Sequence, residues 1–161
     1  MAVDMFLKVD GITGESVDKT HKGEIDVLAW SWGVSNSGST HSGSGGGSGK
    51  ANVQDFSFTK YVDKATPTLM LFSCNGKHIK EATLTVRKAG GDSPVEYLKI
   101  KFSDILVSSV STGGSGGQDR LTENVTLNFA KVALDYVPQS ASGAPEAKIP
   151  MTWDIAANSK D

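Results

Sequence analysis

IDVLAWSW, at residues 25–32, alternates its side chains in a way that decides the expected fold. Successive side chains of a β-strand point to opposite faces, so one face of a strand here carries Leu28, Trp30 and Trp32. That face is expected to lie in the core. The opposite face begins with Ile25 and Val27 and is apolar as well. A strand that is apolar on both faces predicts a second cover, either another sheet, a subunit partner or a helix.

The same period of two recurs through most of the chain, separated by clusters of Gly, Ser and Asp. The segments that show it are Asn52–Tyr61, Ala82–Arg87, Tyr97–Phe102, Asn124–Phe129 and Val132–Val137. Repeated one-sided strands of this kind favour an antiparallel sheet that is closed into a barrel or folded into a sandwich. The expected fold is therefore a mainly β antiparallel barrel of two packed sheets with one short α-helix. We expect residues 1–161 to form a single domain.

One segment, TPTLMLFSCNG at Thr66–Gly76, carries helix signals at both ends. Thr66 can act as the N-cap, Pro67 suits the first helical position, and Gly76 can adopt the left-handed conformation that ends a helix. The apolar run at residues 69–72 is expected to plug a barrel end or to cover an open sheet edge. Cys74 is then expected to be a small buried apolar residue.

Charge and cysteine content exclude several classes of protein. Among 161 residues, 16 Lys and Arg stand against 18 Asp and Glu, so the chain has no basic excess for nucleic acid or anionic lipid. The one cysteine leaves no internal disulfide to form, which fits folding in the cytosol. The N-terminus shows neither a basic region nor a long apolar stretch, so neither a secretory signal nor membrane insertion is expected.

The glycine-rich stretch Asn36–Gly49 lies between two expected strands. A loop of this length is usually functional or disordered, and a symmetric oligomer offers a neighbour that could order it. An intersubunit role and a flexible surface hairpin are both compatible with this composition. The second cluster, Gly113–Gly117, is explained by a tight turn.

No catalytic or metal-binding motif stands in a setting that supports it, and the Gly-x-Ser-x-Gly pattern, which glycine-rich composition alone can match, is discounted. The Walker pattern fails because Ser44 stands at its first glycine and Ala51 follows Lys50. His21, His41 and His78 are scattered singly, which predicts surface or loop histidines and neither a metal nor a cofactor.

The remaining polar residues give no local catalytic signature either. The carboxylates Asp119, Glu123 and Asp135 are expected to be turn acceptors or solvent-facing partners. A hydrolase site assembled across the fold, for example from Cys74 or a serine with His78 and Asp104, stays open.

The same segments resemble the haemolysin-coregulated proteins (Hcp), the tube subunits of the bacterial type VI secretion system. The resemblance covers the chain up to about Tyr136 and is weaker in the helix and in the tail, residues 138–161. The segments that carry it are Met1–Phe6, Glu24–Gly33, Val53–Tyr61, Val86–Gly91, Leu106–Gly117 and Arg120–Leu127.

This resemblance implies a β-barrel that assembles into hexameric rings, which stack into a hollow tube ejected by a contractile sheath. The implied partners are further copies of the chain, sheath proteins, the tip spike protein and small secreted effectors. Such a protein is built in the cytoplasm and ejected to the medium or a target cell without a signal peptide.

The resemblance also implies sites. Ser31 is the candidate for a lumen-facing residue that binds effectors. The candidates for loops between subunits or rings are Ser37, Gly38, Ser39, Gly43, Gly45, Gly46, Gly47, Gly49, Gly90 and Gly91.

Four functions remain distinguishable. A tube subunit predicts rings of several copies, and an effector carrier predicts the same rings with cargo inside. A β-sandwich glycan-binding module predicts monomers with exposed aromatic residues. A hydrolase predicts turnover that one serine or histidine substitution abolishes. The motif search favours a protein that is not an enzyme.

Overall fold

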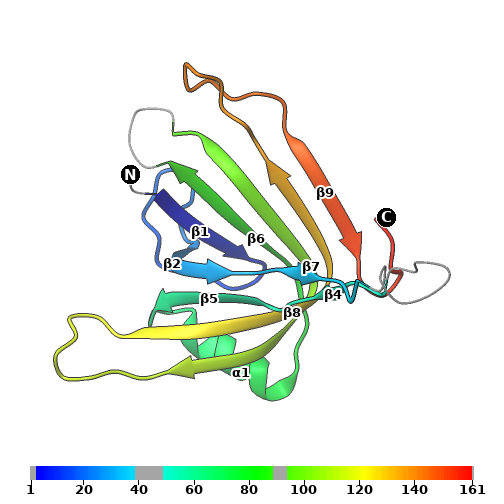
Figure 1. Ribbon diagram of the computed structural model, residues 1–161. Coiled ribbons are helices and arrows are strands. Elements are labelled where there is room, and N and C mark those ends of the chain that lie inside the picture. Colours follow the sequence, from blue (N-terminus) through cyan, green and yellow to red (C-terminus); the bar gives the residue numbers. More distant parts are fainter. Residues whose placement is uncertain (1–2, 39–48, 89–93, 161) are drawn as a thin grey trace.

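The computed structural model describes residues 3–38, 49–88 and 94–160 (Figure 1). Within these ranges the chain forms strands and one helix in the order β1 (Val3–Val9), β2 (Ile25–Ser31), β3 (Val34–Ser35), β4 (Asn52–Val53), β5 (Phe56–Tyr61), α1 (Thr66–Asn75), β6 (Ile79–Lys88), β7 (Glu96–Thr112), β8 (Thr122–Tyr136) and β9 (Ile149–Asp154).

Six of these strands close into a barrel. The strand order is β5-β2-β1-β6-β7-β8, every neighbouring pair is antiparallel, and β5 also pairs with β8. The pairing of β5 with β8 closes the sheet on itself, although β2 and β7 each run on beyond their pairing with β1 and β6. The expected barrel and its single helix are confirmed.

Strand β8 pairs with β7 along one edge and with two further strands along the other. Its first half, Thr122–Leu127, pairs with β5 and closes the barrel, and its second half, Lys131–Tyr136, pairs with β9. The two segments expected at 124–129 and 132–137 are therefore one strand. In Figure 1, β9 continues the sheet outside the barrel beside β8.

The period of two placed the core correctly in most strands. Phe56, Phe58, Ile100 and Leu127 are all buried. Phe102 lies at the centre of the aromatic cluster in the core, since its ring centroid lies 4.6 Å from that of Phe56 and 4.6 Å from that of Phe129.

Strand β2 differs from the expectation because it contains a bulge. Its register against β5 shifts between Val27 and Ala29, and the extra residue at this point is Leu28. Ile25 and Val27 before the bulge are buried, and Trp30 after it packs against the same core, while Leu28 is 38% exposed. The apolar residues of β2 therefore share one face, and the expectation of two apolar faces was wrong.

The helix occurs where it was predicted, with a different start. Ala65 is the N-cap, and the carboxylate of Asp63 accepts a hydrogen bond from the Ala65 N–H at 2.9 Å, so Thr66 is not the cap. Gly76 ends the helix in the left-handed conformation at φ +68°. The helix packs against β7.

Only part of the apolar run in α1 is covered. Leu69 is fully buried, whereas Leu71 is 56% exposed. Cys74, expected to be buried, is exposed because it lies on the side of the helix that faces away from the barrel.

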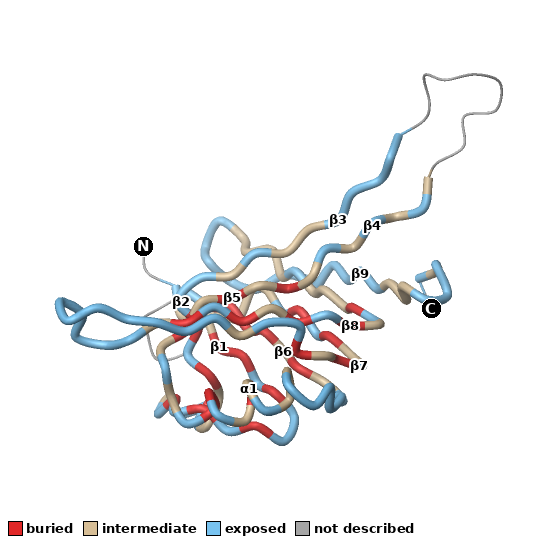
Figure 2. Tube along the Cα trace, turned by 90° about the horizontal axis from the view of Figure 1, so that it is seen from below, coloured by how far each residue is buried: buried red, intermediate tan, exposed pale blue. Residues whose placement is uncertain are grey.

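Strands β3 and β4 form a separate two-stranded ribbon that projects from the barrel (Figure 2). Val34 pairs with Val53 and Ser35 with Asn52. Beyond the ribbon, the side-chain amide of Asn36 donates a hydrogen bond to the Gly49 carbonyl at 2.6 Å. We call this projection, residues 34–38 and 49–53, the arm.

Candidate functional site

The candidate residue Ser31 is exposed and lies at the end of β2, on the outside of the barrel. It pairs with Ser57 of β5, which pairs in turn with Thr126 of β8. Two residues along each strand, Ala29 pairs with Thr59, which pairs with Asn124. We call these six residues the neutral face.

The neutral face carries hydroxyl and amide groups and no charged side chain. The Thr59 hydroxyl donates to the Asn124 side-chain oxygen at 2.7 Å, and the hydroxyls of Ser57 and Thr126 lie 3.3 Å apart. A hollow of about 250 Å³ is lined by five of these residues, including Ser31 and Asn124, together with Trp30 and Phe58. Such a surface offers hydrogen bonds to a molecule that lies on it, and the charged group beside it is the Asp55 carboxylate, which accepts from the Asn128 side-chain amide at 2.9 Å.

Two strand edges flank the neutral face. Strand β2 pairs with β1 only at Ile25 and Asp26, so within the described chain residues 27–31 have a strand neighbour on the β5 side alone. Strand β7 pairs with β6 only as far as Ile105, so residues 106–112 have β8 as their one strand neighbour among the described residues. The strands β2-β5-β8-β7 therefore form a four-stranded surface with an open edge on each side.

The arm contains three of the loop candidates. Ser37 and Gly38 are exposed, and Gly38 has φ +57°. Gly49 faces the Ser37 side chain so closely that a Cβ atom would overlap it. The other loop candidates lie outside the described residues, and these are Ser39, Gly43, Gly45, Gly46, Gly47, Gly90 and Gly91.

An apolar hollow of about 170 Å³ lies where the arm leaves the barrel. Its lining comes from the arm, from Trp32 after β2 and from strands β8 and β9, and comprises Trp32, Val34, Ala51, Val53, Val132, Met151 and Trp153. Met151 is 39% exposed and Ile149, also on β9, is 59% exposed. This edge of the molecule presents more apolar surface than a scattered surface residue accounts for.

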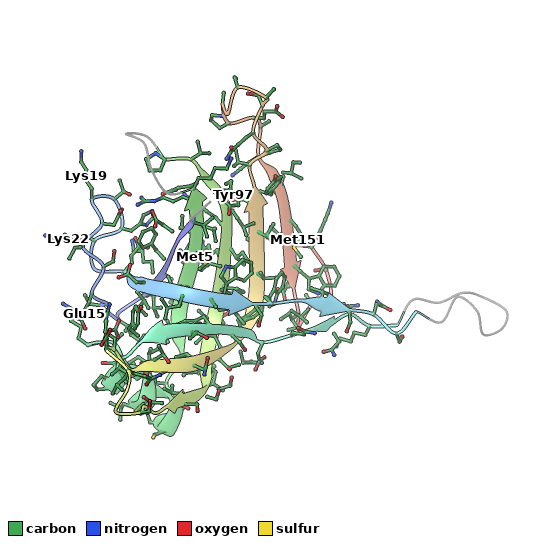
Figure 3. All side chains as sticks on the ribbon, turned by 60° about the vertical axis from the view of Figure 1, so that its left-hand side comes forward. Met5, Glu15, Lys19, Lys22, Tyr97 and Met151 are labelled. Atoms are coloured by element: carbon green, nitrogen blue, oxygen red, sulfur yellow. The ribbon has the colours of Figure 1, made fainter. Side chains whose placement is uncertain are left out.

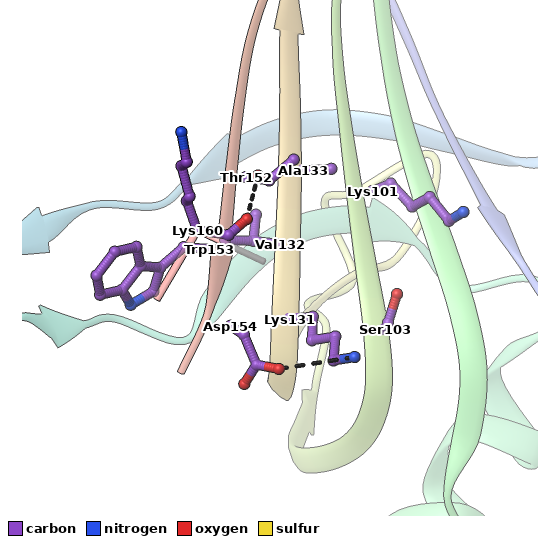
Figure 4. A pocket seen from close by; sticks show the side chains of 9 residues that line it. All are labelled: Lys101, Ser103, Lys131, Val132, Ala133, Thr152, Trp153, Asp154 and Lys160. Carbon is purple, nitrogen blue, oxygen red and sulfur yellow. Dashed lines mark hydrogen bonds and ion pairs between the residues drawn. The ribbon is translucent and has the colours of Figure 1, made fainter. Parts of the chain in front are cut away.

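The outer face of β7, β8 and β9 has the opposite character. Lys101, Lys131 and Lys160 surround a hollow of about 280 Å³, which is drawn in Figure 4. The Lys131 ammonium lies 3.6 Å from the carboxylate of Asp154. This charged surface is separate from the neutral face around Ser31.

A buried ionic cluster was missed by the sequence reasoning. The Lys60 ammonium lies 2.5 Å from Glu123 and 2.8 Å from Asp63, and the side chains of Lys60 and Glu123 are fully buried. The Thr66 hydroxyl donates to the same Glu123 oxygen. Glu123 is thus neither a turn acceptor nor solvent-facing, because it neutralises a buried lysine.

His21 was expected on the surface and is buried instead. Its ring stacks on Phe6 with centroids 4.5 Å apart, and its two nitrogens contact Glu24 and Glu96. Burial would raise the pKa of Glu96, but hydrogen bonds from His21 and Lys99 outweigh burial and leave this pKa below its usual value.

Arg87 makes a second ionic cluster beside His21. Its guanidinium contacts the carboxylates of Asp4 and Asp18. The hydrogen bond that Arg87 donates holds the pKa of the Asp18 carboxyl well below its usual range.

Two further properties bear on function. Across residues 3–38, 49–88 and 94–160, the acidic, histidine and cysteine side chains do not gather into a group of three or more that could hold a metal ion. The described part of the chain also contains no helix with the length and apolar character needed to cross a membrane.

Comparisons with known proteins agree with one another. Residues 6–136 match the family model described as "Type VI secretion system effector, Hcp". Protein hcp1 of Pseudomonas aeruginosa is 64% identical over 159 residues, which is 98% of each chain.

Solved structures are similar over nearly the whole length. A structure described as a type six secretion system protein superposes with a TM-score of 0.92 at 33% identity, over 99% of this chain and 100% of that one. Hcp1 from Salmonella typhimurium superposes with a TM-score of 0.83 at 41% identity, over 100% of both chains.

Proposed function

This chain belongs to the Hcp family of the type VI secretion system, and from that membership we propose that it is the subunit of a hollow, ejected tube. Six copies form a ring, rings stack into the tube, and a contractile sheath drives the tube and its tip spike protein outward. The chain is made in the cytoplasm and leaves the cell with the tube. Small effectors travel in the lumen of the rings.

The observation that carries the ring is the pair of open edges on the β2-β5-β8-β7 surface. An open edge presents unpaired N–H and C=O groups that can pair with another strand. The edge of β7 at residues 106–112 and the edge of β2 at residues 27–31 lie on opposite sides of this surface. Pairing β7 of one copy with β2 of the next is a head-to-tail contact, which closes into a ring when the rotation allows it.

The neutral face supports the lumen proposal. It lies on the same four strands, so a ring built through their edges would turn one face of each copy toward the channel. In the proposed ring, the face turned toward the channel is the one on the outside of the barrel, so Ser31 and its neighbours line the channel. Their hydroxyl and amide groups suit a cargo surface that is polar but of no fixed charge.

The arm and the apolar hollow at its base support contacts between copies. The hollow and the exposed Met151 and Ile149 need a cover, and a second copy of the chain supplies an apolar surface of matching kind. We assign the arm residues Ser37, Gly38 and Gly49 to contacts between subunits or rings. The candidates at 39–47 and at Gly90 and Gly91 belong to the same proposal.

In this proposal the protein is not an enzyme. Its work is done by the channel and by the surfaces through which copies join, which is in keeping with the structural role of the family in secretion.

Size-exclusion chromatography with light scattering, followed by negative-stain electron microscopy, tests the ring. We expect six-fold rings with six times the monomer mass. Strictly monomeric particles over a wide concentration range would overturn the proposal. A monomer that binds immobilised glycans would favour a glycan-binding module instead.

Proline substitution tests which edges join. N–H groups of successive residues alternate between the two sides of a strand, so either Ser109 or Val110 directs its N–H to the open edge of β7. We expect proline at that position to abolish rings while the monomer still unfolds cooperatively. Ala141→Pro is the matched control, because Ala141 occupies the second position of the exposed turn closed by the Gly143 N–H and the Ser140 carbonyl. Rings that stay intact in each of the two single variants, Ser109→Pro and Val110→Pro, would refute the edge pairing.

A further inference from the structure

The segment between β1 and β2, residues 10–24, lies against the outside of the barrel. Phe6 and Leu7 are neighbours in β1 and both are buried, so they lie on opposite faces of that strand. Leu7 belongs to the barrel core, and Phe6 is covered on the outside by His21 from the segment. The Arg87 guanidinium also lies over the Phe6 ring, 4.9 Å from its centroid. Figure 3 shows Glu15, Lys19 and Lys22 of this segment at the outer margin of the molecule.

The ring of His21 meets a carboxylate at each nitrogen. Nδ1 lies 2.8 Å from Oε2 of Glu24, and Nε2 lies 2.6 Å from Oε1 of Glu96. A neutral imidazole carries one N–H, so it can donate only one of these hydrogen bonds, and its other nitrogen would direct a lone pair at a carboxylate oxygen. Both contacts are hydrogen bonds only when the ring carries two protons.

We propose that His21, Glu24 and Glu96 form a proton-binding site that fastens the segment 10–24 to the start of β7. The doubly protonated ring bridges the carboxylate of Glu24, at the end of the segment, and that of Glu96, at the start of β7. Charge-assisted hydrogen bonds of this kind are about twice as strong as neutral ones.

Charged groups from neighbouring elements face His21. Glu24 lies on the same segment, and Glu96 lies at the start of β7. Lys99 of β7 lies 3.2 Å from the second oxygen of Glu96 and shares that carboxylate with His21. Arg87 of β6 is the opposing cation across Phe6, but its charge is met by Asp4 of β1 and Asp18 of the segment.

The sign of the pH effect follows from this arrangement. At low pH the ring holds two protons and both contacts are hydrogen bonds. As the pH rises and the ring loses one proton, one contact becomes repulsive and the attachment of the segment weakens. The backbone hydrogen bonds inside the segment report the change, since the Gly23 N–H donates to the Ser16 carbonyl at 2.8 Å and the Ser16 N–H donates to the Glu24 carbonyl at 3.0 Å.

Hydrogen exchange of the full-length chain tests the proposal, with protection calculated relative to the intrinsic rate at each pH. We expect the protection of residues 14–24 to fall about tenfold or more between pH 6 and pH 9, which is the loss of one charge-assisted hydrogen bond. Strand β8 around Val125 is the internal reference and should keep its protection. Protection of the segment that does not change with pH would overturn the proposal.

Two further measurements separate this proton site from a merely structural contact. In a chain with ¹⁵N-labelled histidine, both ring nitrogens of His21 should show the shift of a protonated nitrogen at pH 7, with the exposed His78 as reference. Glu96→Gln should remove most of the pH dependence, whereas the matched Glu81→Gln, on a half-exposed carboxylate of β6 that pairs with Lys101, should not. A His21 ring with a single proton at pH 7, or equal effects of the two glutamine variants, would refute the proton-binding site.

Discussion

Replacing Lys60 by methionine tests the buried ionic cluster at the start of the helix. The Lys60 ammonium is the only cation in contact with the carboxylates of Glu123 and Asp63 among the described residues, and it also donates to the Tyr61 carbonyl at 2.9 Å. Methionine fills a similar volume but leaves two carboxylates, one fully buried and one 8% exposed, without a positive partner.

The expected cost is large because a charge would remain buried. Breaking one partner of a buried ion pair destabilises a protein by about 3–5 kcal/mol. Whole domains are stable by about 5–15 kcal/mol, so Lys60→Met should remove a substantial part of the free energy of unfolding. Lys60→Met combined with Glu123→Leu should recover part of this loss, because the second change removes the stranded charge.

Urea unfolding followed by tryptophan fluorescence measures the effect, at a concentration where light scattering shows monomers for every variant. The control is Lys101→Met, because Lys101 is 49% exposed and pairs with Glu81 on the surface. We expect the control to change stability by less than about 1 kcal/mol. If Lys60→Met costs no more than the control, the cluster does not stabilise the fold and the reasoning is wrong.

Three further predictions concern Asp104 of β7, the neutral face and the Arg87 cluster. Asp104 has φ +53°, so Asp104→Val should lower stability by about 1–3 kcal/mol in thermal or urea unfolding, while Asp104→Gly should be tolerated; equal effects would show that the left-handed backbone is not the cause. Ser31→Gln should reduce the protection of a bound effector from proteolysis while rings persist, and raising the salt concentration should change that protection little; unchanged effector lifetimes would argue against this surface. The folded-state pKa of Asp18 lies below its unfolded value of 3.8, so its contribution is present at neutral pH and is lost as the pH falls below about 4. Wild type should therefore lose stability in acid more steeply than Asp18→Asn, and parallel unfolding curves would contradict the prediction.

Alternation along the chain was enough to predict the strands but not their irregularities. Phe56 and Phe58 lie inside as expected, and Lys60, which continues their period of two and for which no position was predicted, lies inside with them. The Leu28 bulge has no marker in the residue pattern, since it appears only through the register with β5. The bulge and the buried Lys60–Glu123 pair both depend on contacts between segments far apart in the sequence, which a local pattern does not contain.

The candidate site was predictable only in part. Ser31 could be placed on an outward face of a strand, and the structure adds Ser57, Thr59 and Asn124 beside it because β5 and β8 pair in that register. Strand β9 was not expected, since its residues 149–154 show little alternation and form a strand only against β8. His21 was expected on the surface because the histidines are scattered singly in the sequence, and its partner Glu96, 75 residues away, comes next to it only in the fold.

Strands β7 and β8 change direction together, and this bend gives one sheet two different outer surfaces. In β7 the buried positions are Ile100 and Phe102 before Asp104 and are Ile105 and Val107 after it, so the inward parity switches at this residue. Strand β8 switches in the same place, between Phe129 and Val132. The halves on one side carry the neutral face and the open edge of β7, and the halves on the other side carry the lysines of the charged surface. The left-handed Asp104 lies at the point that separates these two surfaces. Changes at this corner should therefore alter the angle between the two surfaces while leaving the chemistry of each intact.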